Sequence, residues 1–231
     1  MNEKINIADL TLVSGIGDYS VHTACIVSAA VAKWRMEHGE ELGEAGEATV
    51  SIECIDSPIR QFAISINDGI WWRSDKERTE TLLPFIDQIL NTKGSTALTE
   101  RRAYKCADYA VRVFLPMALD LKNPEQAEYL RSLPEIVDVR TAIVGKNAAD
   151  AAGAAASTGL YAARAAGAAA STGLYAARVA GANAADQAAY AAYDAANHAA
   201  YHAAYHASHA TKVPTRTAAL RLLTELCLMT D

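Results

Sequence analysis

The sequence has few of the residues that build a thick hydrophobic core or a charged binding surface. Only 7% of the 231 residues are aromatic and 21% are charged, and tryptophan and phenylalanine occur three times each. Lysine and arginine number 21 against 27 acidic residues, so the net charge is −6, and no basic stripe is present. Nucleic-acid binding driven by phosphate neutralisation is therefore not expected.

Signals of membrane insertion, export and redox chemistry are also missing. No run of about 18 strongly apolar residues occurs, so we expect no membrane span. The first residues include early acidic groups and no apolar stretch before a cleavage site, so we expect no signal peptide and a cytoplasmic location. The widely spaced cysteines favour reduced core residues, with a Cys25–Cys54 disulfide as the alternative. They are Cys25, Cys54, Cys106 and Cys227.

Alanine is the residue that the sequence has in excess. It occurs 49 times, and 32 of these alanines fall between residues 148 and 210. Because alanine buries little apolar area, one uniform globular core is excluded. We predict an all-α fold in three parts. They are a compact N-terminal helical domain (1–140), a closely packed alanine-rich coil or hairpin (141–210) and an amphipathic C-terminal docking helix (211–231).

The first part has well-marked helix boundaries. Ser57-Pro58 predicts a helix start, and Ser74 begins a capping-box pattern. Asn123-Pro124 predicts another start, whereas Pro116 is expected to distort the end of the helix that contains it. Residues 49–55 alternate somewhat in polarity, which is the one indication of a short strand.

The alanine-rich part contains a tandem copy of fourteen residues. The segment AAGAAASTGLYAAR at 151–164 recurs unchanged at 165–178. Glycine and leucine therefore recur seven residues apart, which is typical of a coiled-coil seam. Such small residues let two helix backbones approach closely, so we predict a homo-oligomer or a protein partner. Breaks in this helix are expected at Gly159, Gly173 or Gly181. The seam residues are Gly153, Leu160, Gly167, Leu174 and Gly181.

Three histidines share one helix face in the same part. His198, His202 and His206 recur every four residues, and two such histidines can chelate a transition metal. Three on one straight helix cannot all reach one tetrahedral ion, so a polar stripe is the favoured interpretation. Sequestration of a metal or small ligand by this Tyr/His-rich region is the alternative, and no other cofactor is predicted.

The first part offers one candidate partner surface, formed by Trp71, Trp72 and Arg73. An aromatic–arginine cluster is typical of binding hot spots, and two core tryptophans are the alternative. His22 and Cys25 are residue types of a nucleophile pair, but no orienting Asn or Asp can be assigned, which favours a capping histidine and a core cysteine. No catalytic residue is predicted, and an enzyme is the less favoured function.

One stretch resembles alanine-rich helical proteins of bacteria and phages. The resemblance rests on Lys105–Pro116 (KCADYAVRVFLP) and on a small-residue tail with Asn197–His202 (NHAAYH). It covers about residues 101–210. Some of those proteins are labelled immunity proteins of toxin systems. The resemblance implies a partner-binding protein of a phage or prophage, with a host-interaction, immunity or defence-related role. Together with the small-residue seam, it makes a non-enzymatic interaction protein the leading hypothesis. It carries over no functional residue.

Overall fold

The computed structural model describes residues 6–45, 54–120, 123–155 and 212–231. The chain divides into two compact units, unit 1 (Met1–Lys93) and unit 2 (Gly94–Asp231). Both units are mostly helical, as the composition predicts. The part boundary expected at 140–141 falls inside helix α8, which begins at Val139. Most of the alanine-rich part lies outside the described residues.

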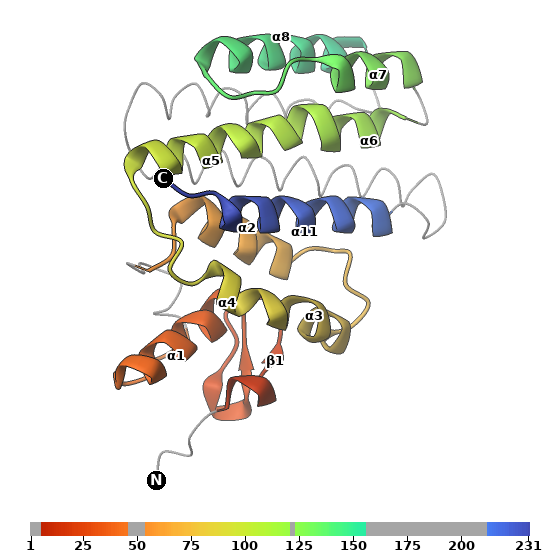
Figure 1. The fold of residues 1–231 in the computed structure, drawn as a ribbon. Helices are drawn as coiled ribbons and strands as arrows, with labels where there is room; N and C mark the ends of the chain where they lie inside the picture. The colour runs from red at the N-terminus through yellow and green to blue at the C-terminus, as the bar shows by residue number, and fades with distance from the viewer. Residues whose placement is uncertain (1–5, 46–53, 121–122, 156–211) are drawn as a thin grey trace. The chain divides into compact units, whose positions relative to one another are not determined.

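Unit 1 combines helices with a short parallel pair of strands (Figure 1). Thr11 pairs with Thr23 and Leu12 with Ala24. The described elements, in chain order, are η1 (Ile7–Asp9), β1 (Thr11–Leu12), η2 (Tyr19–Val21), β2 (Thr23–Ala24), α1 (Ile26–His38), α2 (Ser57–Asn67), α3 (Asp75–Leu82), η4 (Leu83–Phe85) and α4 (Ile86–Ile89).

The strand pair is a departure from the all-α prediction. It is joined by a loop in which Gly17 has a φ of +81°, where a Cβ atom would lie 2.4 Å from the Cα of Ala24. Only glycine fits both the left-handed conformation and this close backbone approach. The strand suggested at 49–55 falls mostly outside the described residues.

Local capping explains why the helices of unit 1 begin where they do. Helix α2 starts at Ser57 with a proline in its first turn, although the capping side chain is that of Asp56. The Ser74 hydroxyl accepts a hydrogen bond from the backbone N–H of Glu77 at 3.1 Å, which confirms the predicted cap of α3.

Unit 2 is built around one long, interrupted helix. Figure 1 shows α11 alongside the first segment of this helix, α5, and α7 beside α8. The predicted docking of the C-terminal helix is confirmed within unit 2, because α11 packs against α5. The described elements are α5 (Thr96–Tyr109), the π-helical turn η5 (Ala110–Phe114), α6 (Leu115–Leu119), α7 (Pro124–Ser132), α8 (Val139–Ala155) and α11 (Lys212–Leu228).

The interruption of the long helix follows from a proline. Pro116 has no N–H to donate to the carbonyl four residues earlier, and the turn before it, Ala110–Phe114, is π-helical. This confirms the predicted distortion. The side chain of Asn123 accepts a hydrogen bond from the N–H of Gln126 at 3.2 Å, which confirms the predicted start of α7. Among the described helices, none has the length and apolar character that crossing a bilayer requires.

Candidate functional site

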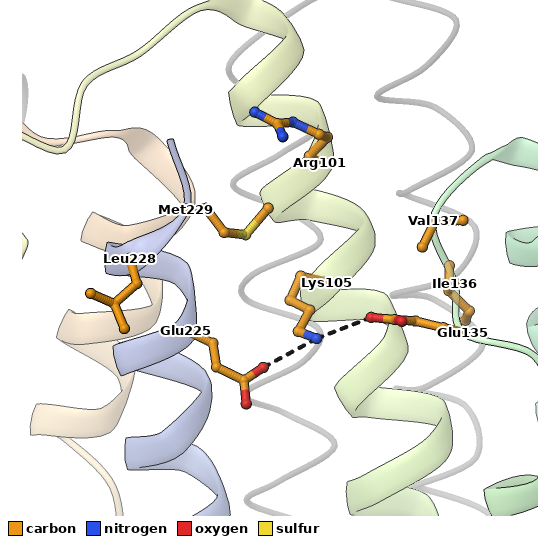
Figure 2. A pocket seen from close by; sticks show the side chains of 8 residues that line it. All are labelled: Arg101, Lys105, Glu135, Ile136, Val137, Glu225, Leu228 and Met229. Carbon is orange, nitrogen blue, oxygen red and sulfur yellow. Dashed lines mark hydrogen bonds and ion pairs between the residues drawn. The ribbon is translucent and has the colours of Figure 1, made fainter. Parts of the chain in front are cut away.

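Unit 2 contains a pocket of about 440 Å³ (Figure 2). Helix α5 contributes Arg101 and Lys105 to it, and lies between two walls. The end of α11 forms one wall, and the loop Glu135–Val137 between α7 and α8 forms the other. The volume is in the range of small-molecule sites, about 300–1,000 Å³. The wall of α11 is lined by Glu225, Leu228 and Met229.

A buried carboxylate fixes the loop wall to α5. The Asp108 Oδ1 atom accepts hydrogen bonds from the backbone N–H of Ile136 and from Arg112 Nη1, each at 2.9 Å. The next helix begins with its own cap, since Asp138 accepts from the N–H of Thr141 at 2.8 Å. The loop backbone is therefore held at both ends.

A buried arginine fixes the other wall. Arg102 of α5 is only 1% exposed. Its Nε and Nη2 atoms donate to the carbonyl oxygens of Leu226, at 3.0 Å, and Met229, at 2.9 Å. Asp231 accepts hydrogen bonds from the N–H and hydroxyl of Ser95, the residue that caps α5. Together these bonds join the end of α11 to the start of α5.

The lysine in the pocket bridges the two walls. Lys105 Nζ lies 3.1 Å from Glu135 Oε1 and 3.1 Å from Glu225 Oε2 (Figure 2). It also lies 5.6 Å from the centre of the Tyr109 ring. Glu225 accepts two further hydrogen bonds, from the Tyr109 hydroxyl at 2.7 Å and from Arg221 Nε at 2.8 Å.

These contacts keep Lys105 charged and Glu225 ionised at neutral pH. Burial acts to lower the pKa of Lys105, but the hydrogen bonds to Glu135 and Glu225 outweigh it, and the net shift is upward. Burial acts to raise the pKa of Glu225, and its three donors reverse this, so the pKa falls below its ordinary value. Burial and Glu225 raise the pKa of Tyr109. The bridge therefore suits positioning better than proton transfer.

Arg101 differs from Lys105, which lies one turn further along the same helix face. Its Nη2 atom donates to the carbonyl oxygen of Thr230. Among the described residues, no carboxylate lies within ion-pair distance of its guanidinium. A second pocket, of about 520 Å³, shares Arg101 and Val137 with the first. Arg101 therefore stands between two cavities with most of its donors unused by the described part of the chain.

Helix α8 presents two different faces. Its buried face is a stripe of small residues, and a Cβ atom on Gly145 would lie 2.6 Å from Ile136 Cδ1. Its outer face leaves Ile143 43% exposed and Val144 41% exposed. We call these two residues the α8 apolar face. The buried stripe comprises Ala142, Gly145, Ala148, Ala149 and Ala152.

The three residues of the partner surface predicted at Trp71, Trp72 and Arg73 differ in their exposure. Trp71 is buried, and its ring fills the space that a side chain on Gly69 would occupy, 2.3 Å from a Cβ atom there. Trp72 is half-buried and its Nε1 donates to the carbonyl of Ile66 at 2.8 Å. Only Arg73 is exposed, so the three side chains do not form one accessible cluster.

The seam and the histidine stripe fall mainly beyond the described residues. Gly153 lies in the last turn of α8. The remaining seam residues and the three histidines lie outside the described ranges. They are Leu160, Gly167, Leu174, Gly181, His198, His202 and His206. Within the described ranges, no three His, Cys, Asp or Glu side chains are placed to hold a metal ion.

Two of the four cysteines are core residues, because Cys25 and Cys106 are buried whereas Cys54 and Cys227 are half-buried. All four are free, so the alternative Cys25–Cys54 disulfide is not formed. The Cys25 sulfur accepts a hydrogen bond from the N–H of Ser28 at 3.3 Å and caps α1. Burial raises the pKa of the Cys25 thiol, which keeps it neutral, whereas His22 is exposed. The geometry agrees with a core cysteine rather than a nucleophile.

Sequence reasoning missed the pocket altogether. Lys105, Glu135 and Glu225 are separated by 30 and 90 residues, and no spacing rule connects them. The available signal was the pair Arg101-Arg102 followed by Lys105 on a helix with an apolar stripe. Comparison of the chain with known protein families, with curated proteins and with solved structures finds no match.

Proposed function

We propose that this protein is a non-enzymatic interaction protein that self-associates through α8 and the alanine-rich part that follows it. The observation that carries the proposal is the α8 apolar face, where Ile143 and Val144 stand exposed. Removing such side chains from water is favourable by about 25 cal/mol per Å² of apolar area. The buried stripe of small residues on the opposite face of α8 already packs against the rest of unit 2. It supports the expectation that alanine-rich helices of this chain pack closely.

The α8 apolar face favours a second copy of the chain as the partner. In an antiparallel pair of α8 helices centred on this face, a two-fold axis places Ile143 of one copy opposite Val144 of the other. Lys146 and Asp150 follow on the same side of α8, and their ion pair of 2.6 Å stays within each copy. The face is therefore complementary to itself in hydrophobicity.

The pocket supports the non-enzymatic side of the proposal. Its lysine is paired with both glutamates, and Glu225 also accepts a hydrogen bond from the Tyr109 hydroxyl. A general acid or base needs a pKa near the working pH, and the shifts of Lys105 and Glu225 move both groups away from neutrality.

Light scattering after size exclusion, across a range of concentrations, tests the proposal. The unmodified chain is expected to form a dimer or larger oligomer, and the double variant Ile143→Glu/Val144→Glu a smaller species. Val213→Glu is the matched control, because Val213 is 46% exposed but lies on α11. A monomeric unmodified chain, or a double variant that associates unchanged, contradicts the role of α8. Leu160→Asp and Leu174→Asp test the predicted seam in the same way.

The biological setting remains the one that the resemblance implies, an immunity or defence-related role in a phage or prophage. A cytoplasmic location and a separate protein partner are part of the same prediction. Metal or small-ligand sequestration by His198, His202 and His206 is the alternative. Native mass spectrometry of protein purified from cells tests it, because a retained metal would add a defined mass that His202→Ala removes.

A further inference from the structure

The lining of the unit 2 pocket carries two cations and two carboxylates, and both carboxylates lie against only one of the cations. Lys105 faces two carboxylates, and Glu225 is also held by Tyr109 and Arg221. Asp231 is held by Ser95, whose hydrogen bonds lower the pKa of the Asp231 carboxyl, and the nearby charge of Arg101 lowers it further. Arg101 makes its hydrogen bond to an uncharged carbonyl. The pocket therefore offers a planar guanidinium whose charge no described carboxylate neutralises by direct contact.

Apolar side chains stand on both walls beside this guanidinium. Leu228 is 73% exposed and Val137 is 57% exposed, although both are large hydrophobic residues. Met229 is half-buried, and Figure 2 shows its side chain directed toward α5. Exposed apolar residues next to a cavity are typical of binding sites, because a ligand can cover them.

We propose that this pocket binds a small apolar carboxylate, such as a medium-chain fatty acid. The carboxylate lies on the Arg101 guanidinium, whose parallel N–H groups match two carboxylate oxygens. The apolar part lies between Met229 and Val137. Lys105 is the weaker anchor for the carboxylate, because Glu135 and Glu225 already occupy its donors. This inference does not depend on self-association.

Titrations of the full chain followed by methyl NMR test the proposal. The probes are decanoate, decanol and decylamine at neutral pH, which share one apolar chain and differ in charge. Decanoate is expected to shift the methyl signals of Met229, Val137 and Leu228, and to bind about tenfold more tightly than decanol because of its charge-assisted hydrogen bonds. Equal binding of the three probes, or shifts confined to other methyl groups such as that of Met36, overturns the proposal.

Two variants separate the charged and apolar halves of the site. Arg101→Gln is expected to weaken decanoate about tenfold and to leave decanol unchanged, whereas Val137→Ser weakens both. Arg101→Lys keeps the positive charge but lacks the two parallel N–H groups of a guanidinium. Its affinity for decanoate is expected to lie between those of the unmodified chain and Arg101→Gln. Arg73→Gln, an exposed arginine of unit 1, is the matched control and is expected to change nothing. Decanoate binding that is unaffected by Arg101→Gln, in a variant with an intact amide spectrum, contradicts the assignment of Arg101.

Discussion

Among the described residues, each unit buries one arginine, and the two arginines hold different elements together. In unit 1, Arg78 donates to the carbonyl oxygens of Asn67, at 2.8 Å, and Leu12, at 3.3 Å, and pairs with Asp75 one turn earlier. In unit 2, Arg102 donates to carbonyl oxygens at the end of α11, more than 120 residues away in sequence. Both satisfy the rule that a buried charge needs hydrogen-bonding partners.

The difference shows how each unit uses its polar groups. In unit 1 they tie loops together, since Asp68 accepts from the N–H of Gly15, 53 residues away in sequence, at 2.8 Å and from Nδ2 of the neighbouring Asn67 at 2.9 Å. In unit 2 the cations of α5 reach distant segments and shape a pocket. Unit 1 therefore resembles a scaffold, whereas the candidate binding chemistry is concentrated in unit 2.

The largest expected effect is that of Arg102→Met. The change leaves the carbonyl groups of Leu226 and Met229 without these donors, which is expected to cost about 3 kcal/mol of unfolding free energy. Hydrogen exchange should rise in α11 and α5. Arg101→Met, at the exposed neighbouring position, is the control and should cost under about 1 kcal/mol. Similar losses from both variants would show that Arg102 has no special role.

Arg78→Met is expected to have a smaller effect, about 2 kcal/mol, because its partner Asp75 is exposed and can be solvated after the change. Chemical denaturation gives the magnitude. Hydrogen exchange shows which segments lose protection, and these should be β1 and the end of α2. Lys76→Met, at an exposed position of the same helix, is the control. Increased exchange in α11 instead would contradict the claim that Arg78 stabilises only elements of unit 1.

Two glycines of unit 1 provide a smaller, matched test. Gly15 and Gly17 both have positive φ, but only at Gly17 does a Cβ atom meet the backbone of Ala24. Gly17→Ala is therefore expected to cost about 2 kcal/mol and Gly15→Ala about 1 kcal/mol. Urea denaturation of the two variants measures the difference. Equal costs would mean that the positive φ alone sets the loss of stability, and that the contact of a Cβ atom with the backbone of Ala24 adds nothing.

The smallest expected effect concerns pH. The folded-state pKa of Glu225 is lowered, so its contribution to stability is present above its unfolded pKa of about 4.3 and is lost as pH falls through the folded value. Glu225→Gln should flatten the acid side of the stability profile by less than about 1 kcal/mol, because the side chain is partly exposed. Glu80→Gln, at an exposed ion pair of unit 1, should leave the profile unchanged. Urea midpoints from pH 7 downward measure both.

Sequence reasoning worked where the deciding contacts are local. Ser74 and Asn123 bond backbone groups three residues away, and Pro116 acts within one helical turn. The sequence left Trp71 open between a partner surface and the core, and the structure buries it. The strands of unit 1 escaped prediction because two residues are too few for a pattern.

Sequence patterns were sufficient to predict that the described units are mostly helical and where several helices begin, and composition alone gave the acidic net charge. The partners of the three cations on α5 follow only from the tertiary structure. Arg102 is buried on carbonyl groups, Lys105 bridges two carboxylates, and Arg101 faces a cavity. Their partners come from distant parts of the chain, and a charge is neutralised by what folding brings within a few ångströms of it, not by its sequence neighbours.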